Sequence, residues 1–280
     1  MLKRSETRRS VLAVALSAVL LSTAIDPVLA VDAPDAKPAL WIITFGNYGV
    51  FEPKAEGSKA YQITGRPIFN VRQSTDREWL SLPNDSIDYE LIETDQLRAG
   101  PVVNGRLGRT GSTADRGSRE LSLVGHPVSV SLEAGAFVEY WPVDWLRTRV
   151  EVRAAAVGGA GVISDLNVDA VWRPNTALTV NAGPRLSIAN GAFMDTYYGV
   201  SAAQAATLRV SKFDADAGVR SYGVGVGFKY KFTPRFSGLG FAEYQRLAGS
   251  AVDSPLIASL GTPNQVSVGL GASYDFHLDW

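Results

Sequence analysis

The 280-residue sequence contains no cysteine and only two histidines, His126 and His277. Without thiols the chain can form neither a disulfide framework nor a thiolate metal site. The two histidines are far apart in the sequence, and no metal-ligand spacing, nucleophile elbow or phosphate-binding loop accompanies either of them. We therefore expect no metal site, no cofactor and no enzymatic activity.

An excess of charge of one sign is also lacking, because 27 basic residues are balanced by 28 acidic ones and the net charge is -1. Proteins that bind nucleic acid normally present a basic surface to the phosphate backbone. Nucleic acid is therefore not an expected partner.

The N-terminal 30 residues have the pattern of a cleaved signal peptide. Basic residues come first, at Lys3, Arg4, Arg8 and Arg9, and the apolar run 11–21 follows, interrupted only by Ser17. The small-residue cleavage site ends at Ala30. A retained N-terminal anchor is the alternative, but this apolar run is short for a membrane helix. We predict an exported protein whose mature part is residues 31–280.

After Ala30 the sequence has no apolar run of about 18 residues, so it predicts no transmembrane helix. A chain that spans a bilayer without helices must form a closed β-barrel, in which all backbone groups pair between strands. The C-terminus shows the required alternation, with apolar residues at Val266, Val268, Leu270, Ala272, Tyr274, Phe276, Leu278 and Trp280. This ending also resembles the sorting signal that the outer-membrane insertion machinery reads, which makes that machinery an expected partner, together with outer-membrane lipid.

Charged residues alternate with apolar ones on three further predicted strands, 128–140, 146–154 and 162–173. The candidate lumen charge network comprises Glu133, Glu139, Arg147, Arg149, Arg153, Asp165 and Asp169. In an antiparallel hairpin, opposed residues have a constant sum of residue numbers. Glu139 with Arg147 and Glu133 with Arg153 both sum to 286, so one register pairs both. The pattern favours a polar lumen, and a water-exposed sheet face is the alternative.

We predict a closed antiparallel transmembrane barrel of twelve strands. The expected strands are residues 39–50, 61–73, 78–82, 87–93, 96–106, 128–140, 146–154, 162–173, 177–189, 218–232, 236–248 and 266–280. Short turns belong on the periplasmic side and long connections outside the cell, which requires an even number. The two short strands, 78–82 and 87–93, are separated by a Pro-Asn-Asp sequence, and ten strands is the alternative.

The long connection 191–216 is the candidate partner or plug loop. It carries Phe193, Tyr197 and Tyr198, and then Gln204 in an Ala-rich stretch, 201–208, with helix propensity. Long loops in compact domains usually have a function. The loop either binds a partner, plugs the lumen, or packs on itself over the barrel mouth.

Several segments carry a family resemblance. They are residues 194–205 (MDTYYGVSAAQA), 213–218 (FDADAG), 244–249 (YQRLAG), 251–256 (AVDSPL) and 264–265 (NQ), with a looser element at 51–58 (FEPKAEGS). On these segments the chain resembles the MipA/OmpV family of outer-membrane proteins, named for interaction with a lytic transglycosylase.

The resemblance implies a scaffold in the outer membrane of a Gram-negative bacterium that helps assemble murein-synthesising and murein-degrading enzymes. Its expected partners are a lytic transglycosylase and a murein synthase. Two alternatives remain: a narrow channel for small polar solutes, and a surface adhesin that acts through its long loops.

Overall fold

The computed structural model of the chain describes residues 41–74, 82, 85–106, 108 and 128–278, all within one compact unit, Pro38–Trp280. Residues 1–30, predicted to be the signal peptide, lie outside the described residues. So do His126 and Trp280.

Within the described residues twelve strands form one sheet, and ten of them have at least ten residues. The long strands are β1 Trp41–Pro53, β2 Tyr61–Gln73, β5 Leu97–Arg106, β6 Ser131–Val143, β7 Leu146–Val157, β8 Val162–Trp172, β9 Leu178–Ala189, β10 Gly218–Lys231, β11 Phe236–Leu247 and β12 Asn264–Leu278. The short strands β3 Ile87–Asp88 and β4 Ile92–Glu93 have two residues each. The order is β2-β1-β12-β11-β10-β9-β8-β7-β6-β5-β3, with β4 also on β5, and the pairings are antiparallel.

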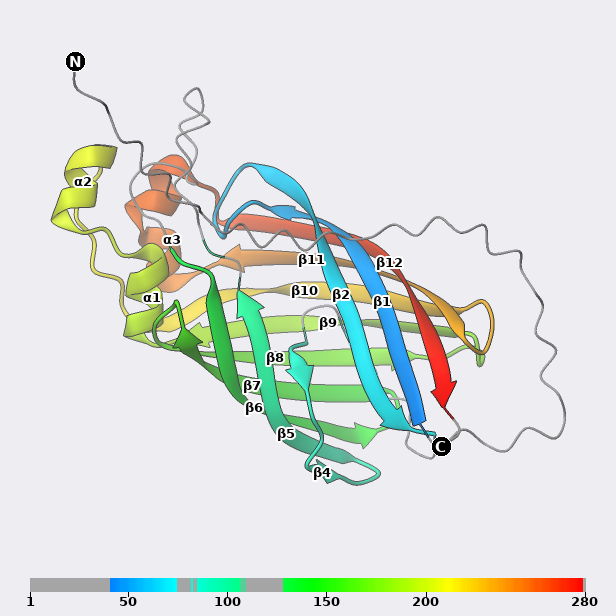
Figure 1. The fold of residues 1–280 in the computed structure, drawn as a ribbon. Helices are drawn as coiled ribbons and strands as arrows, with labels where there is room; N and C mark the ends of the chain where they lie inside the picture. The colour runs from blue at the N-terminus through cyan, green and yellow to red at the C-terminus, as the bar shows by residue number, and fades with distance from the viewer. Residues whose placement is uncertain (1–40, 75–81, 83–84, 107, 109–127, 279–280) are drawn as a thin grey trace, which may run out of the picture. The chain divides into compact units, whose positions relative to one another are not determined.

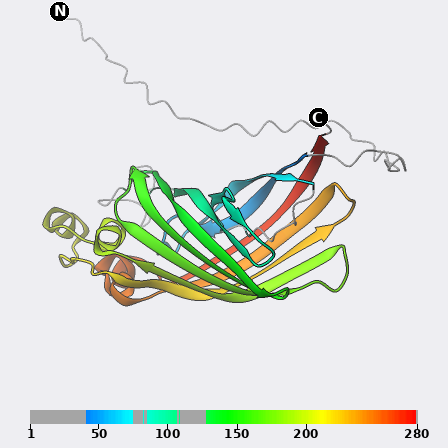
Figure 2. The same cartoon turned by 90° about the horizontal axis from the view of Figure 1, so that it is seen from below.

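The sheet curves into a nearly closed barrel, and the pairing of β1 with β12 joins its two ends in the sequence (Figures 1 and 2). Within the described residues, β2 has no backbone pairing with β3, β4 or β5, so a seam remains at this position. The barrel architecture is therefore as predicted, but the continuous closure that we expected is not present in the described part of the chain.

The seam lies where the two short predicted strands were expected. Residues 87–93 do run antiparallel to β5, because Ile87 lies opposite Val103 and Ile92 opposite Ala99. The predicted strand 78–82 falls mostly outside the described residues, and Leu82 belongs to no strand. Asp85 and Ser86, which follow, contact charged side chains in the barrel interior rather than a neighbouring strand.

The register of the β6–β7 hairpin differs from the prediction by two residues. Glu139 lies opposite Arg149, and Glu133 lies opposite Ala155. The turn is shorter than the expected connection between residues 140 and 146, because Val143 pairs with Leu146. In addition, the register shifts between Tyr140 and Val143. A shift of two keeps every side chain on its face, so the predicted inward-facing charges still point inward.

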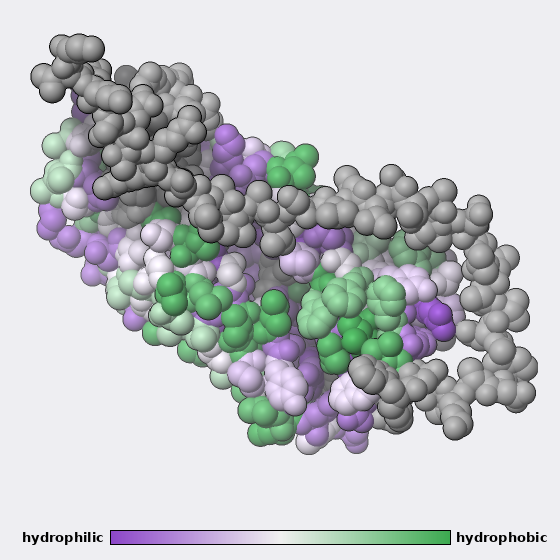
Figure 3. Space-filling view, viewed as in Figure 1, coloured by the Kyte–Doolittle hydropathy of each residue, from purple (hydrophilic) through white to green (hydrophobic). Residues whose placement is uncertain are grey.

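Large apolar residues lie on the outward face of the wall, and Figure 3 shows patches of them among polar residues on one face of the molecule. On β12 the outward residues Val268, Leu270 and Phe276 are 42%, 67% and 47% exposed, whereas the inward Asp275 is 8% exposed. Exposed aromatic residues gather near the short turns, at Trp41, Tyr140, Trp145, Trp172, Tyr230, Phe232 and Phe236. An apolar band bordered by aromatic side chains is the surface of a barrel in a membrane. No helix among the described residues is long and apolar enough to cross a membrane.

Helices cover one end of the barrel, opposite the end at which β12 finishes (Figure 1). They are α1 Gly191–Tyr198, α2 Ala202–Leu208, α3 Gly249–Asp253 and the π-helix η1 Leu256–Leu260. The N-cap of α1 is Asn190, whose side chain accepts hydrogen bonds from the backbone N–H groups of Phe193 and Val162, both at 3.0 Å. We call this end the helical end and the other, with turns such as 144–145, the short-turn end.

Candidate functional site

The barrel interior contains a charge network centred on Glu139, which is fully buried. Its carboxylate accepts hydrogen bonds from Trp141 Nε1 at 2.8 Å, Arg98 Nη1 at 3.2 Å, Arg147 Nη2 at 2.7 Å and Arg149 Nη1 at 3.1 Å. Strand alternation brings these groups together, because β5, β6 and β7 each direct every second side chain into the lumen. A buried carboxylate requires such partners, since it has left water.

Two further carboxylates of the network belong to Asp85, which precedes β3, and to Asp88, the last residue of β3. Asp85 Oδ2 accepts from Arg147 Nη2 at 2.7 Å, and Asp88 Oδ2 lies 2.8 Å from Arg149 Nη2. Ser86 Oγ donates to Glu151 Oε2 at 2.6 Å and accepts from Arg153 Nη1 at 3.1 Å. The connection between β2 and β5 thus inserts polar groups into the lumen instead of completing the wall there.

The network continues toward the helical end and across to β8. Arg153 bonds Glu133 Oε2 at 3.2 Å and Asp165 Oδ2 at 2.5 Å. Asp169 lies 3.3 Å from Arg147 Nη1, and its other oxygen accepts from Arg185 Nη2 at 2.6 Å. The structure therefore brings together all seven charged residues that the sequence grouped. Each of their four carboxylates is paired with an arginine.

Glycines on β10 make room for this network. Arg185 lies so close to Gly225 that a Cβ at that position would be 3.0 Å from Nη2. A Cβ at Gly227 would lie 2.7 Å from Asn181 Oδ1. The alternating glycines of 223–227 thus leave space inside the barrel for large polar side chains of the neighbouring strand β9.

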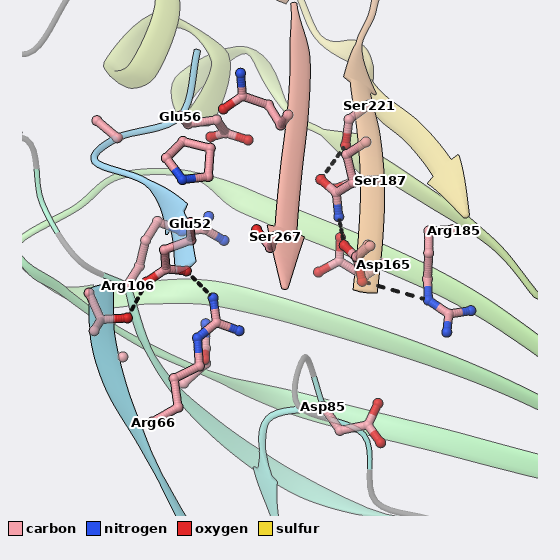
Figure 4. A pocket seen from close by; sticks show the side chains of 18 of the residues that line it. Glu52, Glu56, Arg66, Asp85, Arg106, Asp165, Arg185, Ser187, Ser221 and Ser267 are labelled. Atoms are coloured by element: carbon pink, nitrogen blue, oxygen red, sulfur yellow. Dashed lines mark hydrogen bonds and ion pairs between the residues drawn. The ribbon is translucent and has the colours of Figure 1, made fainter. Parts of the chain in front are cut away.

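Toward the helical end the lumen opens into a polar cavity of about 600 Å³ (Figure 4). On one side of it Glu52 accepts hydrogen bonds from Thr64 and Arg66, and Arg106 lies nearby. The opposite side carries Arg185, Ser187 and Ser221. The cavity ends near Asp85 and Glu151, where the network fills the interior.

The residues of the candidate loop lie in the helical cap. Phe193, Tyr197 and Tyr198 are 2%, 6% and 0% exposed, and they pack with Met194 and Leu256 in an apolar cluster. Tyr197 also lines the cavity. Gln204 is the third residue of α2 and completes its capping box with Ser201. The three aromatic side chains are therefore packed inside the cap, and the partner, plug and self-packed alternatives for the loop stay predictions.

Several lumen residues were not among the predicted site residues. They are Glu52, Arg66, Asp85, Arg98, Arg106, Arg185, Arg220 and Glu243. The strand residues other than Arg220 lie at inward alternate positions, so the period-2 pattern could have identified them. Arg220 breaks the alternation, because the register shift between Val219 and Ser221 buries it beside Ser221. Asp85 had no such signal, because it lies outside any strand.

A sequence model of the family described as MltA-interacting protein MipA matches residues 45–276. No curated protein sequence matches the chain. Solved structures similar in fold include the COG4313 outer membrane channel from Pseudomonas putida F1, at 15% identity and a TM-score of 0.43, with 88% of this chain and 100% of that chain covered. A bacterial polysaccharide outer membrane secretin matches at 10% identity and a TM-score of 0.41, with coverage of 86% and 100%. Because the family match extends over most of the barrel, from β1 to β12, this chain belongs to the MipA family.

Proposed function

We propose that this chain is a non-enzymatic outer-membrane scaffold that binds a murein-degrading transglycosylase, and with it a murein synthase, at its periplasmic end. The chain is an outer-membrane β-barrel protein of the MipA family, and the family's description names an interaction with the enzyme MltA. This family match is the observation that carries the proposal. We infer the identity of the murein-enzyme partners from the family's description and from the sequence resemblance.

The filled lumen supports a scaffold over a channel. Near the short-turn end the buried side chains of Arg147, Arg149 and Glu139 lie across the interior, each held by ion pairs. A conducting pore would need water along its whole length, and an interior packed with paired charges obstructs that path. The polar cavity near the helical end is the only feature in the described residues that favours the channel alternative.

A periplasmic partner would meet the short turns. They comprise residues 94–96, 144–145, 173–177 and 232–235, and they include the exposed Trp145. An exposed aromatic residue at a membrane border can anchor in lipid or contact a protein. Among the described residues, the aromatic side chains of α1 are buried and so are not available to a partner at the cell surface, which weakens support for the adhesin alternative.

The test is site-specific photo-crosslinking in the native envelope. A photoreactive amino acid replaces Gln96, Asn175 or Arg235, each in a short turn, and the captured proteins are identified by mass spectrometry. Arg209, at the end of α2 on the helical end, is the matched control position. Capture of a murein-degrading transglycosylase from the turns and not from Arg209 is expected.

Failure of all three turn positions to capture a murein enzyme, with the barrel correctly inserted, would contradict the scaffold proposal. Planar-bilayer recordings address the channel separately. Steady single-channel currents from the purified chain would favour the channel alternative, whereas the filled lumen predicts that no current is recorded.

A further inference from the structure

We propose that the polar cavity at the helical end is a binding site for a small uncharged polyhydroxyl compound, a mono- or disaccharide or a similar polyol. This inference goes beyond the scaffold proposal and does not depend on it. It rests on which polar groups in the cavity are already paired and which are not.

The charges of the cavity wall neutralise one another. Six basic and six acidic residues line it: Lys54, Arg66, Arg106, Arg153, Arg185 and Arg220, and Glu52, Glu56, Asp85, Glu151, Asp165 and Glu243. Arg66 is paired with Glu52, Arg220 with Glu56 and Arg153 with Asp165. A charged ligand would have to separate such pairs, and removing one partner of a buried pair is strongly unfavourable. The cavity therefore disfavours small anions and cations.

Three neutral side chains of the cavity wall have no hydrogen-bond partner among the described residues, and Asp85 Oδ1 lies 3.8 Å from Arg149 Nε without a hydrogen bond. Gln62 on β2, Asn167 on β8 and Ser267 on β12 line the cavity, and no hydrogen bond to any of their side chains is found in the described structure. Asn167 is only 8% exposed, so little bulk water reaches it. A primary amide and a hydroxyl each both donate and accept. The complementary ligand carries groups that also do both, and sugar hydroxyls are such groups.

Position and size fit the same ligand. The three side chains come from strands on different sides of the barrel, since β2 and β12 flank β1 whereas β8 is four places beyond β12 in the sheet order. A ligand among them would be contacted from several directions. The volume of about 600 Å³ lies within the range of small-molecule sites, and Tyr197 adds one aromatic side chain to the lining. Lys54 and Glu56, which follow the end of β1 at Pro53, also line the cavity.

The test is calorimetric titration of the purified full barrel in detergent with sucrose, trehalose and maltose. Glucuronate and glucosamine serve as charged probes. We expect saturable binding of at least one neutral sugar and at least tenfold weaker binding of the charged probes. Asn167→Ala, Gln62→Ala and Ser267→Ala should each weaken binding by about fivefold, the effect of one hydrogen bond. The matched control is Gln96→Ala, an exposed amide in a turn at the short-turn end.

Absence of saturable binding by every neutral sugar would overturn the proposal, and so would equal binding of the charged probes or wild-type affinity in all three cavity variants. Gln62 lies near the rim and is half-buried, so its variant remains informative if Asn167→Ala fails to fold. Addition of lipopolysaccharide distinguishes two sources of the same chemistry. Displacement of the sugar by the glycolipid would overturn the assignment to a free solute, and undisturbed sugar binding would support it.

Discussion

Replacing Glu139 by alanine should destabilise the barrel more than any change of a single exposed charge. The carboxylate accepts four hydrogen bonds, three of them from the buried arginines Arg98, Arg147 and Arg149. Removing it leaves these cations without their shared counter-ion in an interior that excludes water. Breaking a buried ion pair in this way costs about 3–5 kcal/mol, and we expect a loss of folding free energy in that range. Glu139→Gln, which retains one oxygen acceptor, should lose less.

The assay is equilibrium urea unfolding in lipid vesicles, followed by tryptophan fluorescence and by the shift of the folded barrel on unheated gels. The control is Asp214→Ala. Asp214 forms an ion pair with Lys212 at 2.7 Å, the same distance as Arg147 to Glu139, but both side chains are mostly exposed. Water screens such a pair, so the unfolding midpoint of the control should stay at the wild-type value. Equal midpoints for Glu139→Ala and the wild-type chain would refute the view that the network is a buried, interdependent unit.

Three other predictions test the cap, the wall and the inserted segment. Asn190→Ala removes the acceptor for the Phe193 N–H, and we expect the free energy of unfolding in urea to fall by about 1–2 kcal/mol. An unchanged midpoint would contradict a stabilising role of Asn190 at the start of α1. Val152→Arg puts a charge on the outward face near the middle of β7, which should make insertion into vesicles less favourable by about 2–4 kcal/mol; unimpaired insertion would place Val152 away from lipid. Asp85→Ala combined with Ser86→Ala removes hydrogen bonds that hold the inserted segment, so the conductance in planar bilayers should rise above that of the wild-type chain. Absence of current from both proteins would show that other groups suffice to fill the lumen.

The strand predictions succeeded where one face of a strand meets an apolar surrounding and the other meets polar groups. β12 and β6 show this pattern over their whole lengths, and their outward and inward residues lie as expected. The strand prediction failed between β2 and β5. The Pro-Asn-Asp segment there has no alternation of apolar and polar residues, and the residues that it contacts are distant in the sequence. Asp85 and Arg147 differ by 62 positions, yet they share a hydrogen bond. No local pattern contains such a contact.

The β6–β7 register shows the same limit on a smaller scale. Charge matching favoured Glu139 opposite Arg147, whereas the two-residue turn and the adjacent shift place it opposite Arg149. Long arginine side chains reach carboxylates on either side, so Glu139 bonds both residues and the pairing of charges alone does not select the register.

By itself the sequence determined that the chain forms antiparallel strands with an apolar outer face and a charged interior, because a period of two is encoded in neighbouring residues. Tertiary structure alone decided that the interior is filled near the short-turn end and hollow toward the helical end. It also decided which amide and hydroxyl groups stay unpaired in the cavity. Those properties depend on how side chains from strands far apart in the sequence divide a shared volume. Only the curvature of the sheet brings these strands around one space.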